Sequence, residues 1–245
     1  MKEKKNQSAK WIIIAVLALV VLAAVIIIVP ACRNADDRPD ETSTEPASET
    51  VEPVISVKDD LSLGDGLTIL SVTRYAGYYV EDGSNDIVSG IAAARVRNNG
   101  DRNIQLLSFK LTDSHGQSYS FMITTLLPGQ EVLALEMNRL TFNIDTQIVS
   151  ASVDSRAYFT SAPTLYPDQL RLTCTNGFIT VENISSETVP AGYVYYKNVS
   201  DELWVGGITY RTSFRALAPG EKITLSASHY TDELSRVIFI TYAEQ

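Results

Sequence analysis

The chain has 245 residues, a formal net charge of −9 and a pI of about 4.8. Its length allows one or two domains. Its acidic balance argues against nucleic acid as a partner, because phosphates require Lys and Arg counter-charge. Two cysteines, Cys32 and Cys174, cannot make a disulfide framework, and the two histidines, His115 and His229, lie far apart. We therefore expect no metal site, no cofactor and no enzymatic activity.

An uncharged apolar run over residues 11–31 follows a short N-terminal segment, residues 1–10, that contains four lysines. At 1.5 Å per residue, a helix of this length crosses the roughly 30 Å hydrocarbon layer. Acidic residues follow the run, beginning at Asp36. This charge asymmetry predicts a cytoplasmic segment over 1–10, a transmembrane helix over 11–31 and an extracytoplasmic remainder.

Cys32, directly after the apolar run, leaves a second interpretation open. The preceding residues Val29 and Ala31 are typical of a bacterial lipoprotein signal, in which Cys32 would become the lipid-carrying first residue. Pro30 and the length of the run favour an uncleaved anchor, because signal segments have shorter apolar cores and Pro ends helices. Both interpretations place the rest of the chain on the same side of the membrane.

Residues 32–53 are rich in Asp, Glu, Ser, Thr and Pro. No apolar residue recurs there at the period of a helix or a strand, so the segment cannot bury enough surface to offset its chain entropy. Its like charges repel one another and extend it. We expect a disordered acidic linker that holds the folded part away from the membrane.

From residue 54 onward, short runs of strand-forming residues alternate with Gly, Asn, Asp and Pro. Examples are LTILSVTRY (67–75), IQLLSFKLTD (104–113) and FITVEN (178–183). No long stretch keeps a helical period. The pattern predicts an all-β fold with two tandem Ig-like β-sandwich domains, over residues 54–160 and 161–245.

Two motifs recur in the same order in both halves. Each half has a Val-x-Asn strand end, at Val96–Asn98 and Val181–Asn183, followed later by a Pro-Gly pair, at 128–129 and 219–220. Pro-Gly before an alternating run suits a tight turn. The shared order favours a tandem duplication, although sandwiches in general use similar turn residues.

The segment LRLTCTNGFITV (170–181) allows a hairpin register to be predicted. Asn176-Gly177 favours a two-residue type I′ turn. Such a turn pairs Cys174 with Ile179, and Leu172 with Val181. These four side chains share an apolar face, so we expect Cys174 in the core rather than as a reactive thiol.

Two polar segments invite a chemical interpretation. VEDGSND (80–86) gathers Glu81, Asp82, Asn85 and Asp86, whose oxygens suit calcium. Their spacing departs from the helix-flanked calcium loop, which favours a solvated hairpin loop. His229 lies near Asp232 in a turn-like segment, where acid–base chemistry is the alternative to a solvated turn.

Aromatic residues of the second half suggest a binding patch formed by Tyr193, Tyr195, Trp204 and Tyr210. Trp204 and Tyr210 flank Gly206-Gly207, and glycines let another chain or a sugar ring approach the backbone closely. Tyr and Trp offer a large contact area at low entropy cost. The alternative is that these side chains pack in the core or across strands.

The second half resembles the small Ig-like or fibronectin-like sandwich modules of bacterial membrane-anchored surface proteins. The likeness covers most of residues 170–243 and is carried by VYYKN (194–198), GGITYR (206–211), LAPGEKITLSASHY (217–230) and SRVIFITY (235–242). It implies a sandwich fold and an exterior location. It implies no catalytic residues.

These features predict a membrane-anchored extracytoplasmic protein that binds or spaces, with a protein, peptide or cell-wall glycan as ligand. An accessory subunit that docks in a membrane complex through residues 11–31 is the alternative, and a surface enzyme is a third, weaker one. The sequence indicates neither the ligand nor the oligomeric state.

Overall fold

The computed structural model describes residues 61–84, 86–200 and 203–243. The predicted cytoplasmic segment, transmembrane helix, Cys32 and acidic linker lie outside these residues, as does Asn85. Within the described residues, no helix has the length and apolarity needed to cross a membrane. The described residues all belong to one compact unit.

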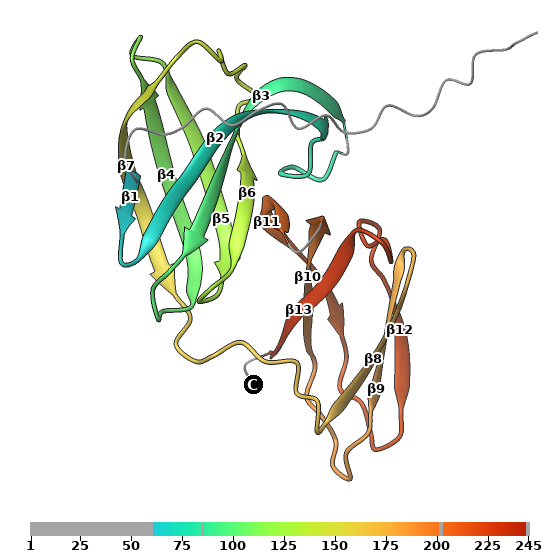
Figure 1. Cartoon of the computed structure of the whole chain (residues 1–245). Coiled ribbons are helices and arrows are strands. Elements are labelled where there is room, and N and C mark those ends of the chain that lie inside the picture. Colours follow the sequence, from blue (N-terminus) through green and yellow to red (C-terminus); the bar gives the residue numbers. More distant parts are fainter. Residues whose placement is uncertain (1–60, 85, 201–202, 244–245) are drawn as a thin grey trace, which may run out of the picture. The chain divides into compact units, whose positions relative to one another are not determined.

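The described part of the chain contains thirteen β-strands and no helix, which confirms the all-β class (Figure 1). The strands of the first half are β1 (Leu61–Gly64), β2 (Leu67–Tyr78), β3 (Ile87–Asn98), β4 (Ile104–Asp113), β5 (Ser118–Leu126), β6 (Glu131–Leu135) and β7 (Ile148–Tyr158). Those of the second half are β8 (Leu170–Thr175), β9 (Phe178–Asn183), β10 (Gly192–Ser200), β11 (Leu203–Phe214), β12 (Lys222–Ser226) and β13 (Ser235–Tyr242).

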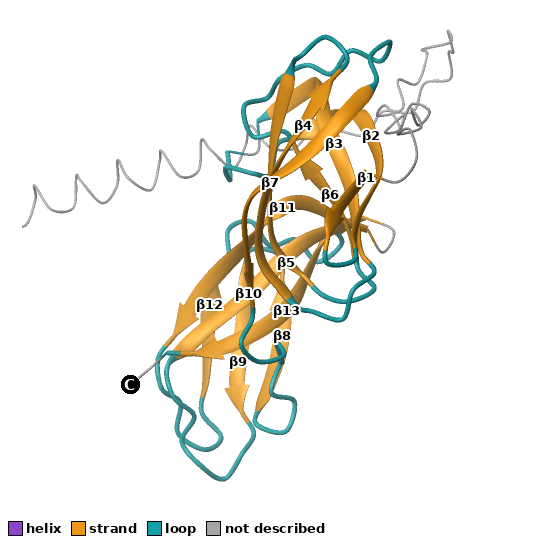
Figure 2. Cartoon of the chain, turned by 90° about the vertical axis from the view of Figure 1, so that its left-hand side faces the viewer, coloured by secondary structure: helices purple, strands orange, loops and turns teal. Residues whose placement is uncertain are grey.

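The strands form three sheets (Figure 2). One seven-stranded sheet has the order β1-β2-β3-β6-β11-β10-β13, and two three-stranded sheets have the orders β5-β4-β7 and β12-β9-β8. All pairings are antiparallel except β6 with β11, which is parallel and joins Trp204 to Val132 and Val205 to Leu133. The largest sheet therefore runs through both halves of the chain.

The first half has its core between β2-β3-β6 and β5-β4-β7, as in a β-sandwich. Strand alternation produces this core: Ala94 and Val96 on β3 are buried, whereas Arg95 and Arg97 between and beyond them are exposed. Large side chains fill the space, and each contributes roughly 1.5–3 kcal/mol on burial. The fully buried ones include Leu107, Phe109, Leu111, Phe121 and Ile123.

The second half repeats this strand arrangement. Its core lies between β8-β9-β12 and β11-β10-β13, and its buried members include Ile179, Val181, Val194, Tyr196 and Ile240. In each half the strand that ends in Val-x-Asn pairs with the strand that follows the Pro-Gly pair: β3 with β6, and β9 with β12. In each half the next strand lies between the first and the third of the strands that follow it: β4 between β5 and β7, and β10 between β11 and β13.

The recurring asparagine of each half ends a strand and is buried. Asn98 donates from Nδ2 to the carbonyl oxygens of Arg102 (2.9 Å) and Leu126 (3.0 Å), and its Oδ1 accepts from Gly100 N–H (3.0 Å). Gly129 N–H also donates to the Asn98 carbonyl, at 2.7 Å. One side chain thus satisfies three backbone groups where the outgoing strand meets the turn and the Pro-Gly loop.

Asn183 makes the same bonds in the second half. Its Nδ2 donates to Glu187 O (2.7 Å) and Leu217 O (2.9 Å), and its Oδ1 accepts from Ser185 N–H (2.9 Å). Gly220 N–H donates to the Asn183 carbonyl at 2.9 Å. The motifs that the sequence pairs therefore occupy equivalent places in the two halves.

The hairpin β8–β9 has the predicted register, with Cys174 opposite Ile179 and Leu172 opposite Val181. Cys174 packs against the second core and is half-buried, and desolvation raises its pKa. The predicted type I′ turn is wrong, because Gly177 has a positive φ of 77° and Asn176 does not. Contacts with the 227–232 segment hold the turn: Gly177 N–H donates to Tyr230 O, and Asn176 Oδ1 accepts from Asp232 N–H.

Two strands have no counterpart in the sequence prediction. β1 is only four residues long, and β7 is an edge strand whose residues are mostly exposed. An edge strand with both faces solvated needs no apolar alternation, so the pattern that identifies the other strands is weak there.

Candidate binding pocket

The four aromatic residues predicted as one patch lie in three places. Tyr193 and Tyr195 share one side of β10, where Tyr195 stacks on Phe239 with ring centroids 4.2 Å apart. Tyr210 packs against the second core, stacks on Tyr196 at 5.6 Å and donates from its hydroxyl to Val80 O at 2.6 Å. Trp204 lines a pocket, described below.

The Gly206-Gly207 pair serves a contact within the chain. A Cβ on Gly207 would collide with the carbonyl oxygen of Met122 on β5, and one on Gly206 would collide with the Val80 side chain. Thr124 Oγ1 also donates to Gly207 O, at 3.3 Å. The backbone that approaches these glycines closely is therefore the protein's own first half, and not the ligand that the sequence suggested.

The acidic segment 80–86 does not gather its carboxylates. Asp82 and Asp86 each pair with Arg139, at 2.6 and 3.0 Å. Glu81 points elsewhere and accepts backbone N–H groups from Leu135 (2.8 Å) and Gly207 (2.7 Å). Among the residues that the structure describes, no group of three or more His, Cys, Asp or Glu side chains is placed to hold a metal ion.

Glu81 and Lys197 are ionisable side chains that interact electrostatically at the junction of the two halves. Glu81 joins the first half to β11, because its second oxygen accepts from Ile208 N–H at 3.1 Å. Lys197 is 1% exposed and donates to Gly207 O (2.7 Å) and Thr124 O (3.3 Å). Burial raises the pKa of Glu81 and lowers that of Lys197 to about 7. The enclosed lysine has no access to a substrate, so we assign the pair a structural role.

His229 makes no pair with the neighbouring carboxylates. Its ring stacks on Tyr210 with centroids 4.6 Å apart and lies beside Gly83 of the 80–86 loop. No ion pair joins it to Asp232 or Glu233. Its position is that of a packing residue between the two halves.

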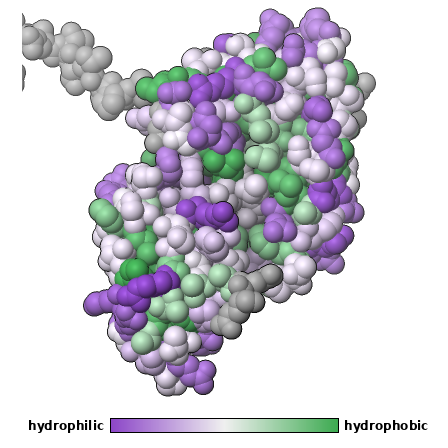
Figure 3. Space-filling model, turned by 180° about the vertical axis from the view of Figure 1, so that it is seen from behind, coloured by the Kyte–Doolittle hydropathy of each residue, from purple (hydrophilic) through white to green (hydrophobic). Residues whose placement is uncertain are grey.

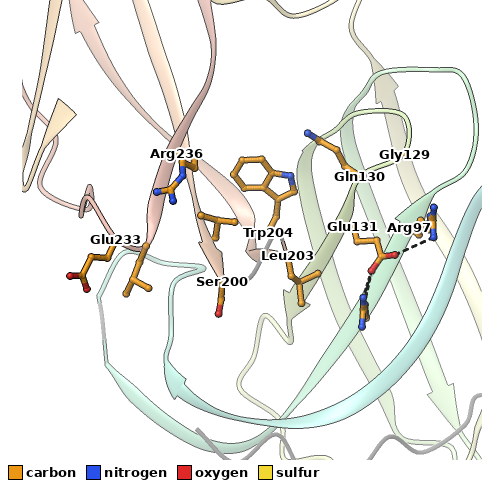
Figure 4. Close-up of a pocket in the computed structure, with 12 residues that line it drawn as sticks. Arg97, Gly129, Gln130, Glu131, Ser200, Leu203, Trp204, Glu233 and Arg236 are labelled. Carbon is orange, nitrogen blue, oxygen red and sulfur yellow. Dashed lines mark hydrogen bonds and ion pairs between the residues drawn. The ribbon is translucent and has the colours of Figure 1, made fainter. Parts of the chain in front are cut away.

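A pocket of about 810 Å³ lies where β3, β6, β10, β11 and β13 meet. It falls within the roughly 300–1,000 Å³ typical of small-ligand sites. The first half contributes Arg95, Arg97, Gly129, Gln130 and Glu131 to its lining. The second half contributes Val199, Ser200, Leu203, Trp204, Glu233, Leu234 and Arg236 (Figure 4).

The parallel pairing of β6 with β11 builds this pocket. It places Trp204 opposite Val132, next in sequence to Glu131, while β3 brings Arg95 and Arg97 alongside on its outward face. Trp204 packs partly against the first core and partly lines the pocket. A rigid sheet therefore positions an indole beside three arginines.

The charges in the pocket are uneven. Glu131 accepts from Arg95 Nε at 2.7 Å and from a second nitrogen of the same guanidinium, whereas its contact with Arg97 is 3.4 Å. Arg236 donates from one nitrogen to the carbonyls of Asp232 (2.9 Å) and Ser235 (2.8 Å). No carboxylate of the described residues forms an ion pair with Arg236. Three arginines face two glutamates in a chain of charge −9.

The lining offers several groups that can bind a ligand. It contains no histidine or cysteine, and Ser200 is its one hydroxyl side chain among the described residues. Arg, Gln and Ser supply hydrogen bonds, and Trp supplies an apolar face. The arrangement can hold a polar, anionic ligand.

Sequence reasoning found one pocket residue, Trp204, and missed the arginines. The alternation in ARVRN places Arg95 and Arg97 together on the outward face of a strand, which was the available signal. Arg236 reaches the pocket through the pairing of separate segments, which no local pattern carries. No protein-family model and no curated protein sequence matches the chain, so its functional assignment rests on the chemistry of this pocket.

Proposed function

We propose that the protein is a membrane-anchored, extracytoplasmic binding protein whose two β-sandwich units, arranged as tandem Ig-like modules, present the pocket around Trp204. The pocket is the observation that carries this proposal. It combines a partly exposed indole with arginine side chains on a sheet, and these groups suit the recognition of a polar ligand. Most of the lining residues lie on strands, which suits recognition.

The exterior location rests on the sequence. Residues 11–31 have the length and apolarity of a membrane span, and the lysines before them favour a cytoplasmic N-terminus. Lipid attachment at Cys32 would serve the same purpose. The face seen in Figure 3 carries hydrophobic groups scattered among hydrophilic ones, as suits a body surrounded by water.

The equivalent hydrogen bonds from the side chains of Asn98 and Asn183 to backbone groups support the tandem arrangement. A duplicated unit that is fused to its copy through a shared sheet is stiff, since relative motion would break the β6–β11 pairing. A stiff body at the end of an acidic tether would hold the pocket away from the membrane surface. The spacer role and the binding role are thus compatible.

A retention assay on cell-envelope preparations tests the proposal. The detergent-solubilised full chain should be retained, Arg236→Gln should reduce retention at least several-fold, and Arg171→Gln, which changes an exposed arginine of β8, should not. Protease added outside intact cells should remove residues beyond the span. Retention unaffected by Arg236→Gln, or lost only when residues 11–31 are replaced, would overturn the pocket-based function and favour the accessory-subunit role.

A further inference from the structure

The arrangement of groups around Trp204 narrows the class of ligand. Figure 4 shows the indole between Arg236 on one side and Gln130, Glu131 and Arg97 on the other. An aromatic face with hydrogen-bonding groups at its two edges suits a ring that has an apolar face and a polar rim. A sugar ring has this character, with C–H groups on its face and hydroxyls around it.

The arginines indicate that the ligand also carries negative charge. Arg95 neutralises Glu131 through two nitrogens, so the 3.4 Å contact from Arg97 leaves that guanidinium with unused donors. One guanidinium nitrogen of Arg236 donates to two backbone carbonyls, and these bonds orient the remaining N–H donors of the planar group. A carboxylate or phosphate binds such a group in a bidentate fashion.

We propose that this pocket binds an acidic saccharide. A sugar ring lies on Trp204, its carboxylate or phosphate contacts Arg236 or Arg97, and its hydroxyls meet Gln130 and Ser200. The inference rests on the proposed function and adds the ligand class to it. A nucleic acid fits poorly, because the chain as a whole is acidic and a polyphosphate needs an extended basic surface.

Direct titration with sugars tests whether the pocket binds an acidic saccharide. The full chain in detergent, with Trp11→Phe so that Trp204 is its remaining tryptophan, is titrated with glucuronic acid, glucose 6-phosphate and glucose while its fluorescence is followed. We expect saturable changes with one or both acidic sugars and binding at least about tenfold weaker for glucose, since a charged hydrogen bond is worth about one decade or more. The two acidic probes separate carboxylate from phosphate as the recognised group.

Matched variants locate the contacts. Replacement by Gln of whichever arginine holds the anionic group, Arg236 or Arg97, should weaken binding of the acidic sugar about tenfold and leave the weak glucose response unchanged, whereas Arg171→Gln should change neither. Trp204→Tyr, followed by calorimetry, should retain part of the affinity that Trp204→Ala loses. Circular dichroism verifies the fold of each variant.

Three results would overturn the inference. Equal affinity for glucose and glucuronic acid would remove the role of the arginines, and equal affinity for a tetraglutamate peptide would remove the saccharide. Absence of binding by all the sugars would also end it. If envelope retention still depends on Arg236 in any of these cases, the pocket-based function stands and only the ligand class is wrong.

Discussion

Replacing Lys197 by methionine tests the buried pair that joins the two halves. Lys197 is 1% exposed, and its amine contacts the carbonyl oxygens of Gly207 and Thr124. Methionine has a similar length and removes the charge. The variant should retain the fold, because methionine fills the same volume, although two carbonyls lose a hydrogen-bond donor. It should change how the free energy of unfolding depends on pH.

The expected magnitude follows from the pKa of Lys197. Desolvation lowers it from 10.5 to about 7. Between these values the unfolded chain binds more protons than the folded one, so the free energy of unfolding rises with pH. At about 1.4 kcal/mol per pH unit, the rise in the free energy of unfolding between these two pKa values is about 5 kcal/mol. About 3 kcal/mol of it should appear between about pH 7 and pH 9.5, and water penetration reduces this value.

Urea unfolding followed by circular dichroism at about pH 7, 8 and 9.5 measures the effect. Higher pH is avoided because burial raises the pKa of Tyr79 to about 12, which makes the unfolding free energy fall above about pH 10. The wild type should gain stability across the series, and Lys197→Met should stay flat, because residue 197 then carries no group that binds or releases a proton. Lys222→Met, on the exposed edge strand β12, should behave as the wild type. A flat wild-type profile, or a rise that survives in Lys197→Met, would refute the reasoning.

Three further changes follow from the structure. Asn183→Ala leaves two carbonyl oxygens and one N–H group without a side-chain partner and should lower the free energy of unfolding by about 2–3 kcal/mol, measured by urea unfolding. Gly207→Ala collides with the Met122 carbonyl and should cost about 3 kcal/mol or more, whereas Gly220→Ala, with open space but a φ of 73°, should cost about 1 kcal/mol. Calcium at millimolar concentration should leave the thermal midpoint unchanged, because Arg139 already pairs with both aspartates; an increase of several degrees would contradict this.

Local sequence pattern was sufficient for most of the strands and for one hairpin register. β4 and β9 begin and end at the residues expected from alternation. In each case one face meets a core and the other meets water or a second layer, so hydrophobicity alternates clearly. The register of β8–β9 followed from a two-residue turn, because the turn length fixes which residues face each other even where the turn type differs.

The features that the local pattern did not predict arise from contacts between segments that are distant in sequence. The turn at Asn176-Gly177 adopts a different conformation from the one favoured locally, because the 227–232 segment donates to and accepts from it. Gly206-Gly207 suggested space for a ligand, and that space is filled by β5. The pocket itself exists only because β6 and β11 pair, and neither strand carries a local signal for that partner.

A comparison of the two halves does show in the sequence that β6 is covered on its outward face and β12 is not. β6 and β12 follow equivalent Pro-Gly turns, so Leu133 and Leu135 correspond to Thr224 and Ser226. In β6 these outward positions are apolar, and Leu135 is fully buried. In β12, which pairs only with β9 among the described strands, they are polar and exposed. The apolar outward face of β6 therefore indicates a strand that is covered on both faces, and in the structure Tyr79, Val80 and Ile91 of the first half pack there. This face gives no signal for the pairing with β11, because backbone groups at the strand edge make that pairing.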